Sequence, residues 1–274
     1  MQVRIVELRC YPIKGCAGVP VDRTRIELAG LTHDREFMAV AAADGGFLSQ
    51  RKHPVLATIR PELRHDGTKL AVTAPGAGEL LIPVLPDGPL RPVTVHSWQG
   101  AGADQGADAA EWFSEVVGAA ARLVRVPPER NRTRDGRYPS RTGFADAYPL
   151  LIASASSLDA LNDRILERGA EPVPMDRFRP NIVVGGWPEP HTEDRVDRMR
   201  AGDVEVGFTK KCKRCSVPLV DQACGRKAGP EPIRTLADYR REQDGGVTFG
   251  ANYAVLAPGQ VAVGDAVMVH SWAV

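Results

Sequence analysis

Short apolar runs separated by glycine- and proline-rich turns recur along the first third of the chain, and this pattern limits the fold more than any other feature. Each run has the length of a strand, and several alternate apolar with polar residues as a half-buried strand does. Turn-forming segments such as DGG, HDG and PGAG separate them. Evenly spaced strands with such turns are typical of a barrel or a sandwich. The runs occupy residues 3–8, 24–28, 36–40, 58–63, 69–73 and 79–82.

The pattern changes near residue 100, where helical spacing appears. Residues 104–121 and 158–168 carry apolar side chains at helical spacing, and Ser156 and Ser157 can cap the second segment. The polar, basic stretch 127–142 is expected to be a mobile loop whose charge could steer an anionic ligand. Further strands are expected at residues 122–126, 150–153, 182–184, 204–208, 254–256 and 266–269. We therefore predict a mixed α/β, β-rich fold with a few flanking helices.

Overall charge and cysteine content exclude several classes of protein. Lys and Arg number 35 against 34 Asp and Glu, so the net charge of +1 favours neither nucleic acid nor an anionic membrane as partner. Five cysteines, an odd number, do not fit a secreted disulfide framework. The first residues interleave charged and apolar side chains, and no apolar run is long enough to cross a bilayer. We expect a cytoplasmic protein with reduced thiols and no membrane span.

Residues 210–216 (KKCKRCS) place two thiols among four cations. Nearby positive charge stabilises a thiolate, which is the form that binds a metal or attacks an electrophile. Three interpretations remain open. A zinc site would need Cys224 and His191 at irregular spacing, since the chain has no second C-x-x-C. A thioredoxin-like pair should precede a helix, whereas residues 217–220 look extended, and the spacing alone favours ordinary loop cysteines.

Three other segments carry cations that suit an anionic ligand. In the segment FRPNI, Pro180 favours extended backbone at Arg179, so Arg179 and Asn181 should project to one side. An arginine fork and an amide suit a phosphate and the edge of a heterocycle. Lys14 lies among small residues that let backbone amides approach an anion, and Arg35 follows an aspartate. Taken singly, a solvated arginine, a turn asparagine and a surface ion pair are the simpler interpretations.

Taken in order, six segments form a series that resembles the MOSC superfamily. They are YPIKGCAGVPV, HDREFMAV, LLIASASSLDALN, FRPNIVV, CKRCSVP and FGANYAVLAPGQVAVGD. The series spans nearly the whole chain and looks closest to two-part members, which include the mitochondrial amidoxime-reducing component and its bacterial relatives. The resemblance implies a MOSC N-terminal β-barrel domain over residues 1–98. It also implies a molybdenum cofactor-binding MOSC domain with a β-barrel core over residues 99–274.

The resemblance also implies a set of site residues. In such proteins the second cysteine of the C-x-R-C segment is the metal ligand, which makes Cys215 the expected catalytic residue. Arg214 precedes it, as in the family pattern. Two positions depart from the mitochondrial relatives, because Gly15 replaces a serine and Asn252 replaces a tyrosine. The residues expected to contact the cofactor are Lys14, Gly15, Arg35, Ser154, Ala155, Ser156, Arg179, Asn181, Cys212, Arg214 and Asn252.

The cofactor implied by the resemblance is molybdenum–molybdopterin, and a soft thiolate suits a metal already bound by dithiolene sulfurs. The implied activity is an oxidoreductase that removes oxygen from small N-hydroxylated compounds. The sequence has no further cysteine set for an iron–sulfur cluster and no glycine-rich fingerprint for NAD or FAD. Electrons are therefore expected from a separate partner, a ferredoxin-like protein or a flavin reductase. Two alternatives stay open: a cofactor sulfurase in which Cys215 carries a persulfide, and a non-catalytic cofactor carrier.

Overall fold

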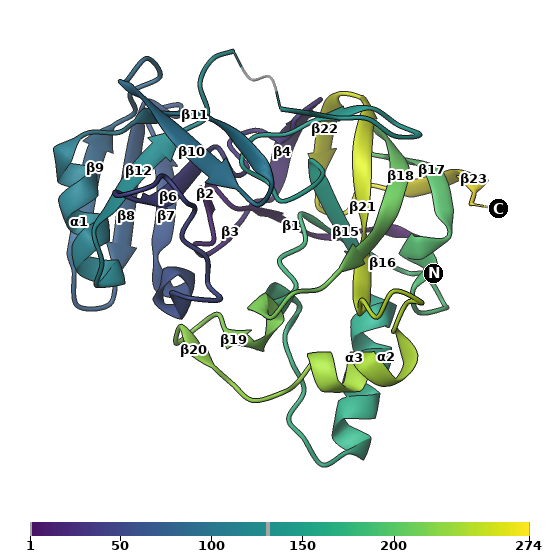
Figure 1. The fold of residues 1–274 in the computed structure, drawn as a ribbon. Helices are drawn as coiled ribbons and strands as arrows, with labels where there is room; N and C mark the ends of the chain where they lie inside the picture. Colours follow the sequence, from purple (N-terminus) through teal and green to yellow (C-terminus); the bar gives the residue numbers. More distant parts are fainter. Residues whose placement is uncertain (1, 130–131, 274) are drawn as a thin grey trace.

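The computed structural model describes residues 2–129 and 132–273, which form two β-rich lobes side by side (Figure 1). Within these residues there are three α-helices, and the other regular elements are strands and short 3-10 helices. The predicted mixed, β-rich fold with few helices is confirmed. In this part of the chain no helix combines the length and the apolar character needed to span a bilayer.

An eight-stranded sheet forms the lobe built mainly from the C-terminal half. Its strands, in order across the sheet, are β23 (Val267–Trp272), β17 (Val196–Ala201), β18 (Val204–Lys213), β21 (Thr248–Ala257), β15 (Leu150–Ser154), β16 (Ile182–Gly185), β1 (Arg4–Cys10) and β3 (Val19–Pro20). Only β15 and β16 run parallel. Ile152, Val184 and Tyr253 belong to the apolar core of this lobe. The first strand of the chain is thus built into the sheet of its second half.

Two helices pack together beside this sheet (Figure 1). Leu161 and Ile165 of α2 (Ala155–Glu167) share an apolar cluster with Leu236 of α3 (Ile233–Tyr239). The second expected helix therefore exists, but it begins three residues earlier than its expected start at residue 158. The cap is Ser154 rather than Ser156 or Ser157, because the Ser154 hydroxyl accepts the Ser157 backbone N–H (3.2 Å).

The other lobe packs a five-stranded sheet against a three-stranded sheet and a helix. The larger sheet runs β10 (Leu90–Val95), β11 (Trp98–Asp104), β12 (Ala121–Arg125), β6 (Phe37–Ala41) and β2 (Ile13–Lys14). The smaller one runs β7 (Arg60–Arg64), β8 (Lys69–Ala74) and β9 (Gly78–Pro83). Phe37, Leu70, Ile82 and Leu123 form a common core with Phe113 of α1 (Ala107–Val117). The three strands expected in residues 58–82 are present.

The expected boundary between residues 98 and 99 falls at the start of β11. This strand pairs with β10 on one side and β12 on the other, so one sheet continues to Arg125. Parts of the chain that are far apart in sequence also pair, because β4 (Arg23–Glu27) lies between β22 (Gly259–Ala262) and β5 (Gly30–Leu31). The two lobes therefore exchange strands, and the division of the chain into two domains stays a prediction.

Two segments differ from their expected form. Residues 127–142 contain a hairpin of β13 (Thr133–Arg134) and β14 (Ser140–Arg141), and Arg132 beside it is buried. Its guanidinium donates to the carbonyl oxygens of Gly143 (3.2 Å) and Asp146 (3.0 Å), which ties this segment to the protein interior. Residues 130 and 131 lie outside the described residues. Residues 217–219, expected to be extended, form a 3-10 turn because Pro218 fixes its φ near the helical value.

The remaining elements are short. They are the 3-10 helices η1 (Pro54–Thr58), η2 (Met175–Arg177), η3 (Thr192–Asp194) and η4 (Val217–Leu219), and the paired strands β19 (Val220–Asp221) and β20 (Arg226–Lys227). The sequence patterns do not predict β10, β17 or α3. The helix expected over residues 104–121 is shorter in the structure, where α1 covers only residues 107–117.

Candidate functional site

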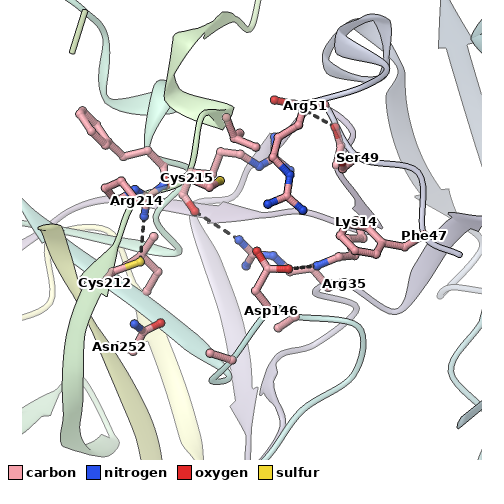
Figure 2. Close-up of a pocket in the computed structure, with 18 of the residues that line it drawn as sticks. Lys14, Arg35, Phe47, Ser49, Arg51, Asp146, Cys212, Arg214, Cys215 and Asn252 are labelled. Atoms are coloured by element: carbon pink, nitrogen blue, oxygen red, sulfur yellow. Dashed lines mark hydrogen bonds and ion pairs between the residues drawn. The ribbon is translucent and has the colours of Figure 1, made fainter. Parts of the chain in front are cut away.

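A cavity with about 870 Å³ of empty space, open to solvent, lies where the two lobes meet (Figure 2). Its walls come from β2, the loop after β6, the segment before β15, and the end of β18 with the loop that follows. The expected site residues that line it are Lys14, Gly15, Arg35, Arg179, Asn181, Cys212, Arg214, Cys215 and Asn252.

A buried polar network around Asp34 forms one wall of the cavity. Arg35 donates to Asp34 Oδ2 (2.5 Å), to Asn181 Oδ1 (2.9 Å) and to the Arg179 carbonyl oxygen (3.2 Å). The guanidinium carbons of Arg35 and Arg179 lie 4.4 and 4.3 Å from the centre of the Tyr11 ring. Burial alone would lower the pKa of Arg35, but Asp34 raises it. These guanidiniums are therefore fixed in place by contacts that also hold the fold together.

Arg179 reaches the cavity from a backbone conformation that the sequence analysis did not predict. Its φ is +58°, in the left-handed region, rather than extended. The residue ends a tight turn after η2, in which its N–H donates to the Asp176 carbonyl oxygen (3.2 Å), and this turn overrides the preference set by Pro180. Its Nη1 donates to Gln222 Oε1 (3.2 Å), and Gln222 is paired through its amide with Gln50. Burial lowers the pKa of Arg179.

Lys14 faces the cavity from β2 and forms an ion pair with Asp146. The His96 Nε2 atom lies 3.1 Å from the same carboxylate oxygen. The Lys14 ammonium also lies 5.0 Å from the centre of the Phe47 ring, and burial lowers the pKa of Lys14. Gly15 follows at φ +83°, a conformation that glycine adopts without strain. The lysine is thus held in place by a carboxylate that itself borders the cavity.

The two thiols at the end of β18 are held differently. Arg214 donates from Nη1 to Cys212 Sγ (2.9 Å) and from Nη2 to the Phe178 carbonyl oxygen (2.9 Å). Its Nε is buried and has no partner among the described residues. Cys215 is exposed, and neither its thiol nor the Asn252 amide makes a hydrogen bond within the described chain. Cys215 is therefore the accessible thiol of the pair.

Three expected site residues do not line the cavity. Ser154, Ala155 and Ser156 lie at the start of α2. The Ser154 hydroxyl lies 2.6 Å from that of Ser157, and the Ser156 hydroxyl donates to the Glu189 carbonyl oxygen (3.3 Å). The hydroxyl groups in this segment are thus engaged within the protein.

Two segments that the sequence analysis did not select do line the cavity. They are residues 47–51, after β6, and residues 145–148, before β15. Figure 2 shows Arg51 and Asp146 pointing into the cavity from these segments. The glycine pair before residue 47 indicates a turn, but a single arginine or aspartate in a loop has no periodicity or spacing that marks it. Only the tertiary structure brings them to the site.

The zinc interpretation of the two thiols finds no support in the described residues. These contain no group of three or more His, Cys, Asp or Glu side chains that could hold a metal ion. His191 lies instead against the rings of Tyr239 and Phe249, at 5.7 and 6.2 Å between ring centres. There, burial and the positive charge of Arg240 lower the pKa of His191 to about 3.

The cavity carries a marked excess of positive charge. Asp146 is the one carboxylate among its described lining residues, whereas five cations line it: Lys14, Arg35, Arg51, Arg179 and Arg214. Arginine forks, the unpartnered N–H of Arg214, the Asn252 amide and an accessible thiol complete the donor set. Such a set fits a ligand that combines a phosphate, a polar heterocycle and a soft metal ion.

Two family models match the chain. The MOSC N-terminal beta barrel domain matches residues 2–120, and the MOSC domain matches residues 139–268. The chain belongs to the MOSC family, and the resemblance seen in the sequence is confirmed. The first match extends past residue 98 to a point near the start of β12, the central strand of the five-stranded sheet.

Curated relatives narrow the comparison within this family. The chain is 32% identical to mitochondrial amidoxime-reducing component 1 of Mus musculus, over 96% of this chain and 81% of that protein. It is 33% identical to mitochondrial amidoxime reducing component 2 of Bos taurus, over 96% and 82%. A molybdenum cofactor sulfurase of Oryza sativa subsp. japonica is 28% identical over 94% of this chain but only 33% of its own length. These matches connect the chain with proteins of molybdenum cofactor chemistry.

Proposed function

We propose that the protein is a molybdenum–molybdopterin-dependent reductase of N-hydroxylated compounds, in which Cys215 is the protein ligand of the metal. The observation that carries this proposal is an accessible thiol on the wall of a cavity lined by five cations and one carboxylate. Amidoxime-reducing components, the relatives that match nearly the whole chain, support the reductase class. When bound, the cofactor supplies the two-electron chemistry of oxygen removal.

The residues of the cavity divide the work of holding such a cofactor. Lys14 and Arg35 supply positive charge for the terminal phosphate, since charge-assisted hydrogen bonds are the strongest contacts available to it. Arg214 and Asn252 each have an N–H group that no described residue accepts. These groups are available to the ring system of the cofactor. Asn181 spends its amide on Asp34 and Arg35, so we assign it a positioning role rather than a direct contact.

The proposed reaction balances with an external source of electrons. The N–O bond of R–NH–OH breaks, two electrons and two protons are consumed, and the products are R–NH2 and water. We propose that the electrons come from a separate ferredoxin-like protein or flavin reductase, since the sequence has no signature of a second redox cofactor. The protons come from solvent through the open mouth of the cavity.

Cofactor analysis tests the proposal directly. Protein purified from a host that makes the cofactor should contain molybdenum and pterin in amounts close to that of the chain, with little zinc. The loaded protein should reduce benzamidoxime when an electron-transfer protein and its reductant are added, and should not do so with NADH or NADPH alone. Stoichiometric zinc without pterin would contradict the proposal, and so would loaded protein that reduces no N-hydroxylated compound.

A second function is favoured by the match to the rice sulfurase, which covers nearly all of this chain. In that case the exposed Cys215 carries a persulfide sulfur instead of binding the metal. Incubation with a cysteine desulfurase and radiolabelled cysteine would then label the chain at Cys215. Labelling without reductase turnover would favour the sulfur carrier, and turnover without labelling would favour the reductase.

A further inference from the structure

Arg51 differs from the other cations of the cavity in having no polar partner. Lys14 pairs with Asp146, Arg35 with Asp34, and the remaining two arginines donate to protein acceptors. The Arg51 guanidinium, in contrast, makes no hydrogen bond or ion pair within the described residues. Its guanidinium carbon lies 5.9 Å from the centre of the Phe47 ring. An arginine in a cavity without a partner is available to a ligand.

The backbone that carries Arg51 is nevertheless anchored on both sides. Gln50 is almost fully buried, and its Nε2 donates to the Gly15 carbonyl oxygen (2.7 Å). On the other side, the Lys52 N–H donates to the Ser49 carbonyl oxygen (3.0 Å). The guanidinium therefore extends from a fixed base into the space between Cys215 and Lys14 (Figure 2). This arrangement holds the guanidinium in place while its N–H groups remain without protein acceptors. A ligand can therefore accept hydrogen bonds from all of them.

We propose that Arg51 selects N-hydroxylated substrates that carry a carboxylate, and this proposal rests on the reductase function proposed above. The other four cations are held by protein groups on the wall that runs from Cys215 to Lys14, along which we expect the cofactor, whereas Arg51 reaches toward this wall from across the cavity. Arg51 belongs to the loop after β6, beside the apolar surfaces of Phe47 and Leu48, which suit the organic part of a substrate. A guanidinium binds a carboxylate through two parallel hydrogen bonds, which a neutral substrate cannot form.

The test compares two substrates that differ only in charge, benzamidoxime and its 4-carboxy derivative. Wild-type loaded protein should have a KM at least about tenfold lower for the carboxylated compound, the gain expected from one charge-assisted contact. Arg51→Gln should abolish this preference, and Arg51→Lys should retain only part of it. Lys52→Gln is the matched control, because it removes an exposed cation from the next position and should leave the preference intact.

Cofactor content and direct binding separate the possible failures. If Arg51→Gln loses pterin, the guanidinium binds the cofactor's phosphate and the proposal is overturned. An unchanged ratio of the two KM values in Arg51→Gln would also overturn it. If wild-type protein reduces neither compound, the proposed function fails instead. Equilibrium dialysis of both compounds against the loaded protein then still tests the role of Arg51. Wild-type protein should bind the carboxylated compound more tightly, and Arg51→Gln should not.

Discussion

The two sides of the cavity hold their chemical groups in different ways. On one side, Arg35, Arg179 and Asn181 are buried and held in place by contacts with Asp34, Tyr11 and their neighbours. On the other side, Arg51 and Cys215 reach into the cavity without a polar partner in the described chain. We therefore expect the held groups to serve stability and binding together. The free groups depend on a ligand for their partners, so they can be changed with little loss of stability.

The largest effect should come from the free thiol. Cys215→Ser should abolish reductase turnover, because serine replaces a soft sulfur ligand with a hard, protonated oxygen. Pterin content should stay close to that of the wild type, since the phosphate contacts come from other segments. Cys212→Ser should keep substantial activity, because a serine oxygen can also accept from Arg214. Turnover by Cys215→Ser would move the metal ligand elsewhere, and Cys224→Ser controls for loss of an exposed thiol.

Residues on the side of the cavity that is held by protein contacts should contribute to the stability of the apo-protein. Asn181 makes hydrogen bonds with Arg35, Asp34, Leu151 and Arg9. Asn181→Ala should lower the free energy of unfolding by about 2–4 kcal/mol, because it leaves several buried polar groups without partners.

Asn252→Ala is the matched control for this experiment. This second asparagine is also nearly buried, but its amide makes no hydrogen bond within the described chain. Its removal should change the free energy of unfolding by no more than about 1 kcal/mol. Urea denaturation of the two apo-proteins compares them, and equal losses of stability would remove the distinction between held and free groups.

Local patterns in the sequence were sufficient to predict several strands of the lobe that contains the three-stranded sheet. The strands β7, β8 and β9 lie within two residues of their expected positions, because alternating apolar residues and glycine turns mark them. Lys14, Arg35, Arg179 and Cys215, which the family segments select, all line the same cavity. Their individual roles remain predictions.

What could not be predicted depends on pairing between distant parts of the chain. The strand β11 contains Gly100, Ala101 and Gly102, which have low strand propensity, and it forms because β10 and β12 flank it. The conformation of Arg179 is set by a turn and by its contact with Tyr11, not by the proline that follows it. Nothing in the sequence distinguishes Arg51 from the neighbouring cation Lys52, so only the fold shows that Arg51 faces the cavity and Cys215.

The pH dependence of anion binding should distinguish the lysine of the cavity from its arginines. Burial lowers the pKa of Lys14 below the ordinary value of 10.5, whereas the guanidiniums stay charged throughout. Lys14 binds an anion while it is protonated, so this contribution is lost as pH rises through its lowered pKa. Sulfate binding to the apo-protein should weaken a few-fold as pH rises from neutral toward the ordinary lysine value of 10.5. In Lys14→Arg this decline should disappear, and an identical decline in both proteins would rule out Lys14 as its source.

The smallest expected change in stability is the sharpest test of the comparison. Arg51→Ala should alter the free energy of unfolding of the apo-protein by less than about 0.5 kcal/mol, since no polar partner in the described chain is left behind. Arg179→Ala should lower it by about 1–3 kcal/mol, because Gln222 loses its donor and Tyr11 loses a stacked cation. Both changes remove one arginine from the same cavity, so charge repulsion among the remaining cations is relieved in each. The difference between them therefore measures how firmly each guanidinium is built into the fold. Equal losses would mean that Arg51 is a structural residue and not a group reserved for a ligand.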